Sequence, residues 1–269
     1  IYSFFVVSIF WVLIINIYRS SKSRSFYGVI AAGGSMGALF GSEISKRFAS
    51  SFNEYGLELF SLGTAILLFL AMMTALYIIK TRSYEIQVSD KVGGSGFDGI
   101  KNVIGKSEIR SIAIYTWIWT ALMTVHWITA INIIEGSIQN SEERIIFFGV
   151  LEQIVSPLAL FTQLLLTNII IKSFGLRTIL FSYGVIFLFV FVFYASVPSI
   201  TVVAIATVFL RLFEYAINKP TREIVYSFLD KNDRYKSSVF IDTFVTRLGD
   251  FSGSGFIAIG KLASITFNI

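Results

Sequence analysis

Four polar residues lie at helical spacing within a long apolar stretch of the sequence. They are Arg211, Glu214, Asn218 and Arg222. Because successive members are three, four and four residues apart, their side chains share one face of a helix. A charge at the centre of a membrane-spanning helix costs about 2.5–3.5 kcal/mol on insertion scales, so such residues face a cavity or a partner. Guanidinium groups bind phosphate and carboxylate through a planar fork of donors, and the stripe therefore predicts a site for an anionic solute.

The next apolar stretch repeats this combination of charges. Arg211 in the first stretch and Arg247 in the second both fall near mid-depth, where two guanidinium groups would face one cavity. We therefore predict that three residues bind substrate and that five others gate the site or pair with them. The predicted substrate-binding residues are Arg211, Arg222 and Arg247. The predicted gating or pairing residues are Glu214, Lys219, Glu223, Asp242 and Asp250.

Structural roles remain open for these charges. Arg211 could pair with Glu214, three residues along its own helix, and separate pairs of arginine and carboxylate could do no more than hold helices together. Lys219, Arg222 and Glu223 fall near the cytoplasmic end of their stretch, where each side chain could extend to the lipid headgroups. These alternatives need no substrate.

Pro220 lies among these charged residues. It removes one helical hydrogen bond and predicts a kink near Ala216. A kink beside charged residues suits a gate, and Asp242 could close its cytoplasmic mouth by pairing with Arg222 or Lys219.

His126 and Glu152 are possible proton sites. His126 stands among tryptophans, where a packed or interfacial role is the alternative, whereas Glu152 falls inside an apolar stretch. The chain has one histidine and no cysteine, which excludes a disulfide, a cysteine-ligated metal and a metal site with several histidines. Arrangements of catalytic serine, histidine and carboxylate residues are absent from the sequence. We therefore expect neither an enzyme nor a bound cofactor.

The elements that position these residues must lie in lipid. Of the 269 residues, 55% are hydrophobic and only 14% are charged, against about 25% charged in a typical soluble domain. Eight stretches approach the roughly 20 apolar residues that a spanning helix needs. In lipid such runs must be helical, because each backbone group needs an internal partner, so the predicted fold is an all-α, polytopic membrane protein. The predicted spans are 1–18, 26–45, 57–79, 110–135, 144–171, 177–195, 200–229 and 238–260.

The loops between these stretches set the predicted topology. Loops at 19–25, 80–110, 172–177 and 230–237 carry most of the lysines and arginines and are therefore cytoplasmic by the positive-inside rule. The net charge of +5 thus reflects topology and not nucleic-acid binding. The chain starts at an isoleucine inside an apolar run, and we interpret it as an internal fragment of a longer protein without a signal peptide. A bacterial inner membrane or an organelle membrane would hold it.

The long cytoplasmic loop divides the chain into two predicted halves. Residues 1–79 would form the end of an N-terminal half with three spans, and residues 110–269 a C-terminal half with five. The linker 80–109 contains a flexible glycine-rich stretch, followed by apolar residues at helical spacing that predict a short amphipathic helix on the membrane surface. The glycines lack the spacing and the preceding strand of a nucleotide-binding loop.

Two of the predicted spans carry glycines four residues apart, a pattern that allows close approach of helices in lipid. These are Gly33, Gly37 and Gly41 in the second span and Gly249 and Gly253 in the last. Both spans follow a basic loop. This is a weak internal sequence similarity, compatible with the repeats of a transporter.

The sequence resembles the ATP/ADP translocase (nucleotide antiporter) family of plastids and intracellular bacteria, together with its bacterial relatives. The specific part of the resemblance runs from NKPTRE at 218–223 through LDKNDRYKSS at 229–238 to IDTFVTRLGD at 241–250. RSFYG at 24–28 and AAGG at 31–34 agree with an earlier part of the family pattern.

The resemblance implies a major facilitator fold of twelve helices, of which this chain would cover the fourth to the eleventh. It also implies exchange of ATP for ADP by alternating access. Arg222 and Glu223 stand where the family has a Lys/Arg-Glu pair, and Asp242 and Arg247 stand where it has Asp and Arg.

The sequence therefore predicts a membrane transporter for a small anionic solute, most simply a nucleotide. One alternative is a proton-coupled facilitator of another solute, which would use Glu152 or His126. The other is a membrane receptor or assembly subunit that transports nothing, in which the charged stripes are structural pairs.

Overall fold

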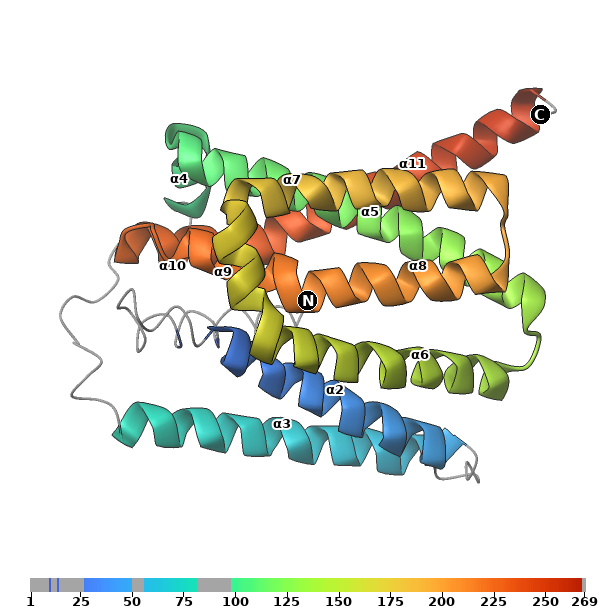
Figure 1. Ribbon diagram of the computed structural model, residues 1–269, viewed down its shortest axis with the longest axis horizontal. Coiled ribbons are helices and arrows are strands. Elements are labelled where there is room, and N and C mark those ends of the chain that lie inside the picture. The colour runs from blue at the N-terminus through green and yellow to red at the C-terminus, as the bar shows by residue number, and fades with distance from the viewer. Residues whose placement is uncertain (1–9, 11–13, 15–26, 50–55, 82–97, 268–269) are drawn as a thin grey trace.

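The structure is a computed structural model that describes Phe10, Ile14 and residues 27–49, 56–81 and 98–267. All regular elements of this part are helical, and most run along the long axis of the molecule (Figure 1). The α-helices are α2 (Tyr27–Ala49), α3 (Gly56–Thr81), α4 (Asp98–Gly105), α5 (Ser107–Ser137), α6 (Ser141–Phe161), α7 (Thr167–Ser196), α8 (Ile200–Phe213), α9 (Lys219–Tyr226), α10 (Lys231–Phe240) and α11 (Thr246–Phe267). Three π-helical turns join some of them, namely η2 (Thr162–Leu166), η3 (Glu214–Asn218) and η4 (Ile241–Val245).

Three helical stretches among the described residues are long and apolar enough to cross a membrane. They are Ser107–Ser137, Ser141–Ser196 and Ile200–Tyr226. Two shorter apolar segments, Val29–Ile44 and Leu62–Ile78, lie within α2 and α3. The described chain therefore has the all-α character and the membrane-helix character that its composition predicts, with three such stretches where the sequence predicts eight spans.

The difference from eight spans has identifiable sources. Ser141–Ser196 contains two predicted spans, 144–171 and 177–195, in one helical run. The predicted span 238–260 is helical, as parts of α10, η4 and α11, but it is not among the three long apolar stretches. The predicted span 1–18 lies outside the described residues except for Phe10 and Ile14.

Gly175 divides the long run Ser141–Ser196. A straight α-helix of 56 residues would measure about 84 Å, whereas a hydrocarbon core is about 30 Å thick. Gly175 has φ +74° and ψ 158°, a conformation that residues with a Cβ atom rarely adopt. Figure 1 shows α6 running towards the left-hand side and the greater part of α7 running back. The run therefore traverses the molecule twice.

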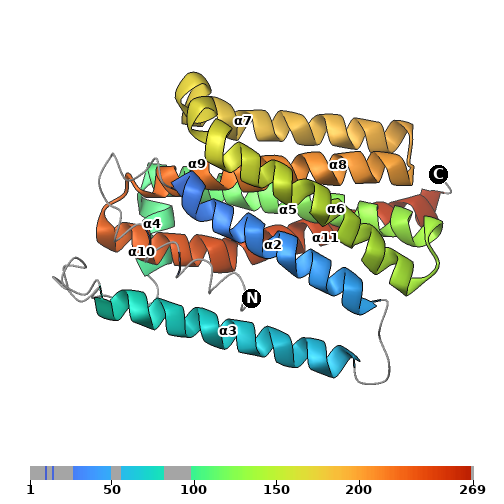
Figure 2. The same ribbon diagram turned by 60° about the horizontal axis from the view of Figure 1, so that its bottom comes forward.

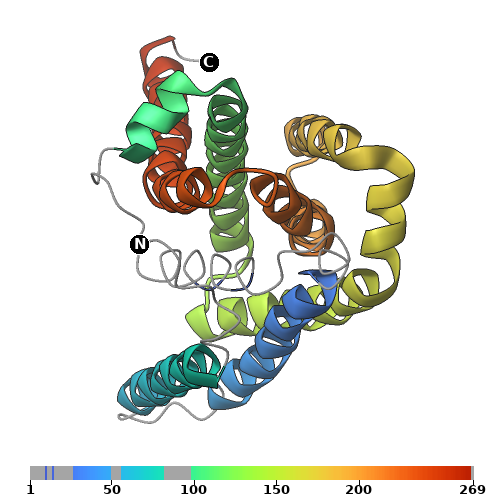
Figure 3. The same cartoon turned by 90° about the vertical axis from the view of Figure 1, so that its left-hand side faces the viewer.

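The largest apolar core joins α5, α7 and α8. It contains Ala130 and Ile134 from α5, Tyr183 and Phe187 from α7, and residues of α8 that include Leu210. Viewed along the long axis, α7 and α8 lie on one side of α5, α4 and α11 lie on the other, and α2, α3 and α6 lie below (Figure 3).

Glycines allow α11 to approach α5 closely. A Cβ atom on Gly249 would lie 2.7 Å from Cβ of Thr120, and one on Gly253 would lie 2.5 Å from the main-chain oxygen of Ala121. Close helix approach is thus confirmed for these two glycines. It is not found at Gly33, Gly37 and Gly41, where a Cβ atom would meet nothing within 4 Å in the described structure. α2 packs against α6 through other residues, which include the buried Ser35.

Much of the helical surface is apolar and exposed. The described side chains of α3 from Leu62 to Leu70 are all exposed, and this helix lies apart from the others at the bottom of Figure 1 and Figure 2. Phe181 on α7 and Phe251 on α11 are 76% and 77% exposed. Contiguous apolar surface of this kind is rare on soluble monomers and is the kind that contacts lipid or other helices.

Pro220 changes the helix in a different way from the predicted kink. The sequence predicts a bend near Ala216, whereas the structure has the π-helical turn η3, of which Ala216 is the middle residue. Since Pro220 has no amide hydrogen, the carbonyl of Ala216 lacks its usual helical partner. The hydroxyl of Thr167 donates to that oxygen at 2.6 Å. A side chain of α7 thereby completes the backbone hydrogen bonding.

The short helix α4 lies in the segment that the sequence predicts to be an amphipathic surface helix. It packs against α10, and a Cβ atom on Gly99 would lie 2.7 Å from Cβ of Phe240. Lys236 pairs with Asp98 at 2.6 Å, and Lys106, just after α4, pairs with Asp233. Helix α4 is therefore fixed to α10 by ion pairs at both of its ends.

Candidate functional site

A pocket of about 450 Å³ lies between α2, α6 and the two π turns η2 and η3. Its polar lining comes from Ser35, Ser156, Gln163, Tyr215 and Lys219. Within the described part of the chain, the ammonium group of Lys219 makes no ion pair. Since Lys219 is partly buried and a cation favours an anionic partner, this pocket is the best candidate binding site.

Gln163 connects the two sides of this pocket. The hydroxyl of Ser35 on α2 donates to Oε1 of Gln163 at 2.9 Å, and Nε2 of Gln163 donates to the main-chain oxygen of Tyr215 at 2.9 Å. Neither Gln163 nor Ser35 is predicted as a site residue from the sequence, because neither is charged. A glutamine within an apolar run, shortly after Pro157, is the signal that could have drawn attention to it.

Arg211 lies beside the pocket and is bound to Glu152. The two charged groups approach to 2.5 Å, so α8 is paired with α6. Arg211 also donates to the hydroxyl of Tyr215 at 3.1 Å, and its guanidinium lies over the rings of Trp127 and Tyr215. Arg211 thus pairs with Glu152, whereas Glu214, the partner expected in the structural alternative, pairs with Arg222. Because α6 packs against α8, Glu152, one of the predicted proton sites, lies against Arg211.

Glu152 has a second partner on its own helix. The hydroxyl of Ser156, which lines the pocket, donates to Oε1 of Glu152 at 3.0 Å. A chain of contacts therefore leads from the pocket through Ser156 and Glu152 to Arg211. Tyr215, which lines the pocket and accepts a hydrogen bond from Arg211, is a second connection between the pocket and this guanidinium.

Arg222 faces a different part of the structure from Lys219. It donates to Glu214 at 3.4 Å, and its guanidinium lies 4.5 Å from the ring centre of Trp119 on α5. Glu214 also accepts from Asn218 at 2.5 Å, and Asn218 in turn accepts from Tyr115 at 2.5 Å. Arg222 lines a second cavity, of about 440 Å³, between α5, α7 and α9. Of the predicted stripe, Arg222 therefore lines this second cavity and not the pocket beside Lys219.

Glu223 is buried next to a second carboxylate. It is 5% exposed and forms no hydrogen bond or ion pair in the described structure. The charged groups acting on it are those of Asp242 on η4 and of Arg222 and Lys219 on its own helix. Asp242 therefore acts on both Glu223 and Arg222.

Arg247 and Asp250 pair with each other on α11. Their charged groups are 2.6 Å apart, and both side chains remain about one-third exposed. The hydroxyl of Thr124 on α5 donates to Asp250 at 2.9 Å. The ion pair therefore lies within α11, and it is the hydrogen bond from Thr124 that connects Asp250 to α5.

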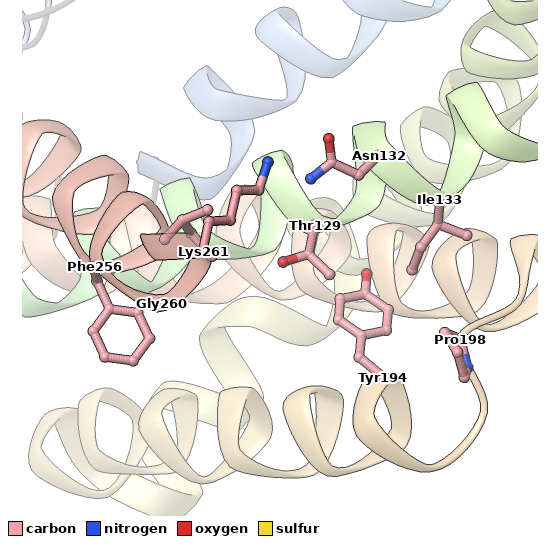
Figure 4. Close-up of a pocket in the computed structure, with 9 residues that line it drawn as sticks. Thr129, Asn132, Ile133, Tyr194, Pro198, Phe256, Gly260 and Lys261 are labelled. Atoms are coloured by element: carbon pink, nitrogen blue, oxygen red, sulfur yellow. The ribbon is translucent and has the colours of Figure 1, made fainter. Parts of the chain in front are cut away.

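His126 is fully buried between α7 and α8. Its Nδ1 lies 2.9 Å from the hydroxyl of Tyr194, and its Nε2 lies 3.4 Å from the hydroxyl of Thr207. Tyr194 also lines a cavity of about 400 Å³ near the ends of α5 and α11, which Thr129, Asn132 and Lys261 surround (Figure 4). His126 is therefore a hydrogen-bonded core residue one side chain away from this cavity.

Comparisons with protein-family models, curated proteins and solved structures find no match to this chain. Among the described residues, no group of three or more histidine or acidic side chains could hold a metal ion. What the candidate site can do chemically therefore follows from its own geometry. It offers a lysine ammonium that has no ion pair among the described residues, two serine hydroxyls, an amide and a tyrosine around a pocket, with a paired guanidinium next to them.

Proposed function

We propose that the protein is a membrane transporter that binds a small anionic metabolite in the pocket between α2, α6 and η3. The observation that carries this proposal is the position of Lys219, whose ammonium lines the pocket without an ion pair in the described chain. The resemblance to nucleotide antiporters favours exchange of ATP for ADP. A multi-pass location in a bacterial inner membrane or an organelle membrane belongs to the same proposal.

The proposed mechanism is alternating access around Gln163. This residue lies in the C-terminal half, where it donates to η3, and it accepts a hydrogen bond from Ser35 of α2 in the N-terminal half, so the bond from Ser35 is a contact that a rocking motion of the halves would break. An incoming anion would bind Lys219 and draw Arg211 from Glu152. The ligand would then replace the carboxylate of Glu152 as the counter-charge of Arg211. Binding of the anion would in this way be linked to closure of the site.

Uptake of labelled ATP into vesicles preloaded with ADP tests this function with the full-length protein. We expect uptake that depends on the preload, and Lys219→Ala should weaken ATP binding by at least about tenfold, equivalent to ~1.4 kcal/mol. Lys172→Ala is the matched control, because Lys172 is an exposed cation outside the pocket. Absence of preload-dependent uptake would rule out nucleotide exchange.

The same vesicles separate the alternatives. A proton-coupled facilitator of another solute would respond to a pH gradient and lose that response on replacement of Glu152 or His126. A receptor or assembly subunit would show no transport, and no anion would protect it from thermal unfolding.

A further inference from the structure

Glu223 presents a problem that the proposed anion site does not explain. A carboxylate that is 95% buried would normally need an ion pair or hydrogen bonds to stay ionised, because burial removes its hydration. Glu223 has neither in the described structure. Arg222, the nearest arginine in sequence, is paired with Glu214.

Burial and the neighbouring Asp242 oppose a negative charge on Glu223, whereas Arg222 and Lys219 on its own helix favour one. Asp242 on η4 is a second carboxylate, and the two acidic groups act on each other. The buried hydroxyl of Tyr226 lies near both. Tyr226 on α9 packs with Ile241 and Val245 of η4 in one apolar cluster, which holds the two helices together at this point. Carboxylates placed side by side do not both ionise readily and tend to share a proton.

The other charged or titratable groups around Glu223 are few. Arg222 and Lys219 lie on its own helix, Glu214 on η3 acts through Arg222, and Tyr115 on α5 reaches Glu214 through Asn218. α2 and α7 also contact α9, and their described residues form no ion pair with it.

Lys219 and Glu223 are four residues apart and hence neighbours on one face of the helix. An ionised Glu223 would offer Lys219 an ion pair across one turn and draw its ammonium away from the pocket. A protonated Glu223 leaves the charge of Lys219 available to an anion.

We propose that Glu223 is a proton-binding site, placed beside Asp242, whose occupancy is linked to anion binding at Lys219. At a pH at which Glu223 is ionised in the empty protein, one proton from the solvent adds to its carboxylate as the anion enters, and this proton leaves with the anion. The linkage to an anion rests on the proposed function, whereas the proton site itself does not. By reciprocity, a proton that favours the anion is itself bound more tightly when the anion is present.

Infrared difference spectroscopy of the purified full-length protein tests the proton site without any ligand. We expect a protonated-carboxyl band at neutral pH that Glu223→Gln removes and that the exposed control Glu142→Gln retains. A spectrum unchanged by Glu223→Gln would overturn the proposal. Asp242→Asn gives an independent check, because removing the neighbouring charge should move the disappearance of this band to lower pH.

Binding of ADP, measured by calorimetry in buffers of different ionisation enthalpy, tests the linkage. Above the pH at which the carboxyl band disappears, we expect ADP to bind with proton uptake and its affinity to fall by up to tenfold per pH unit, with both effects lost in Glu223→Gln. Proton uptake that persists in Glu223→Gln would overturn the linkage. The carboxyl band without any ADP binding would support the proton site and contradict the proposed nucleotide function.

Discussion

The hydroxyl of Thr167 donates a hydrogen bond to the main-chain oxygen of Ala216, at 2.6 Å. This is the oxygen that Pro220 leaves without an amide donor. One residue earlier, the oxygen of Tyr215 accepts from Gln163 at 2.9 Å. Side chains of η2 and α7 thus satisfy two successive carbonyls of η3. They thereby stabilise the π-helical turn in a stretch of helix that carries buried charges. π-Helical turns are often found at functional sites.

Replacing Thr167 with valine should expose the importance of this bond. Thr167→Val leaves a buried carbonyl unsatisfied and should lower the free energy of unfolding by about 1–3 kcal/mol. In a Pro220→Ala background the loss should be smaller, because an amide at position 220 can reach the oxygen of Ala216. Thermal unfolding in detergent measures both, and Thr178→Val, at an exposed position of α7, is the control. Equal losses in the two backgrounds would contradict the assignment.

Alanine substitutions on α11 should differ sharply between neighbouring glycines. Gly253→Ala would place a Cβ atom 2.5 Å from a main-chain oxygen of α5, and overpacking of this kind costs about 1–3 kcal/mol. Gly255→Ala meets nothing within 4 Å in the described structure and should be neutral or stabilise the helix by up to about 1 kcal/mol. Unfolding temperatures of the two variants provide the comparison, and similar values would show that α5 and α11 are not in close contact.

The pair of Arg211 and Glu152 should behave as a buried ion pair. Glu152→Gln leaves the guanidinium without its counter-charge and should cost about 3 kcal/mol of stability. The corresponding change in an exposed pair, Glu135→Gln beside Arg144, should cost less than about 1 kcal/mol. If Arg211 lies on the anion path, added ADP should restore more stability to Glu152→Gln than to Glu135→Gln. An equal response to ADP would separate Arg211 from the site.

Gln163→Leu should affect both stability and binding. It removes two hydrogen bonds and leaves the oxygen of Tyr215 buried without a donor, so we expect a loss of about 1–3 kcal/mol together with weaker ADP binding. The conservative Gln163→Glu retains an acceptor for Ser35 but adds a negative charge to the pocket, so it should weaken ADP binding further. Scintillation proximity binding on purified protein would measure both. Unchanged affinity in both variants would place the ligand elsewhere.

Arg247→Ala distinguishes the site from the helix-holding alternative. Its partner Asp250 lies on the same helix, and both side chains are partly exposed. We therefore expect a stability loss below about 1 kcal/mol and preserved ATP uptake. Abolished uptake with unchanged stability would return Arg247 to the substrate-binding set that the sequence predicts.

Composition and periodicity were sufficient to predict the all-helical fold and the membrane character, because in an apolar run both depend on local sequence. Partners across helices were harder to foresee. Arg211 bonds Glu152, which is 59 positions away, because α6 and α8 pack together, and helical spacing offers only Glu214. Lys219 and Arg222 are three residues apart, yet they face different cavities because α9 lies between α2 and α5. Gln163 carries no charge and so gave no electrostatic signal.

The backbone conformation of Gly175 has a consequence for membrane sidedness. A left-handed residue there lets one apolar run of 56 residues become two passes in opposite directions. If position 175 instead continued the helix, every later element would enter the bilayer from the other face. The basic segment at 230–237 would then lie in the compartment opposite to the one that the positive-inside rule predicts for it. The backbone conformation of Gly175 thus decides whether the number of crossings before α9 is odd or even. That number decides towards which side of a membrane Lys219 and Glu223 would lie.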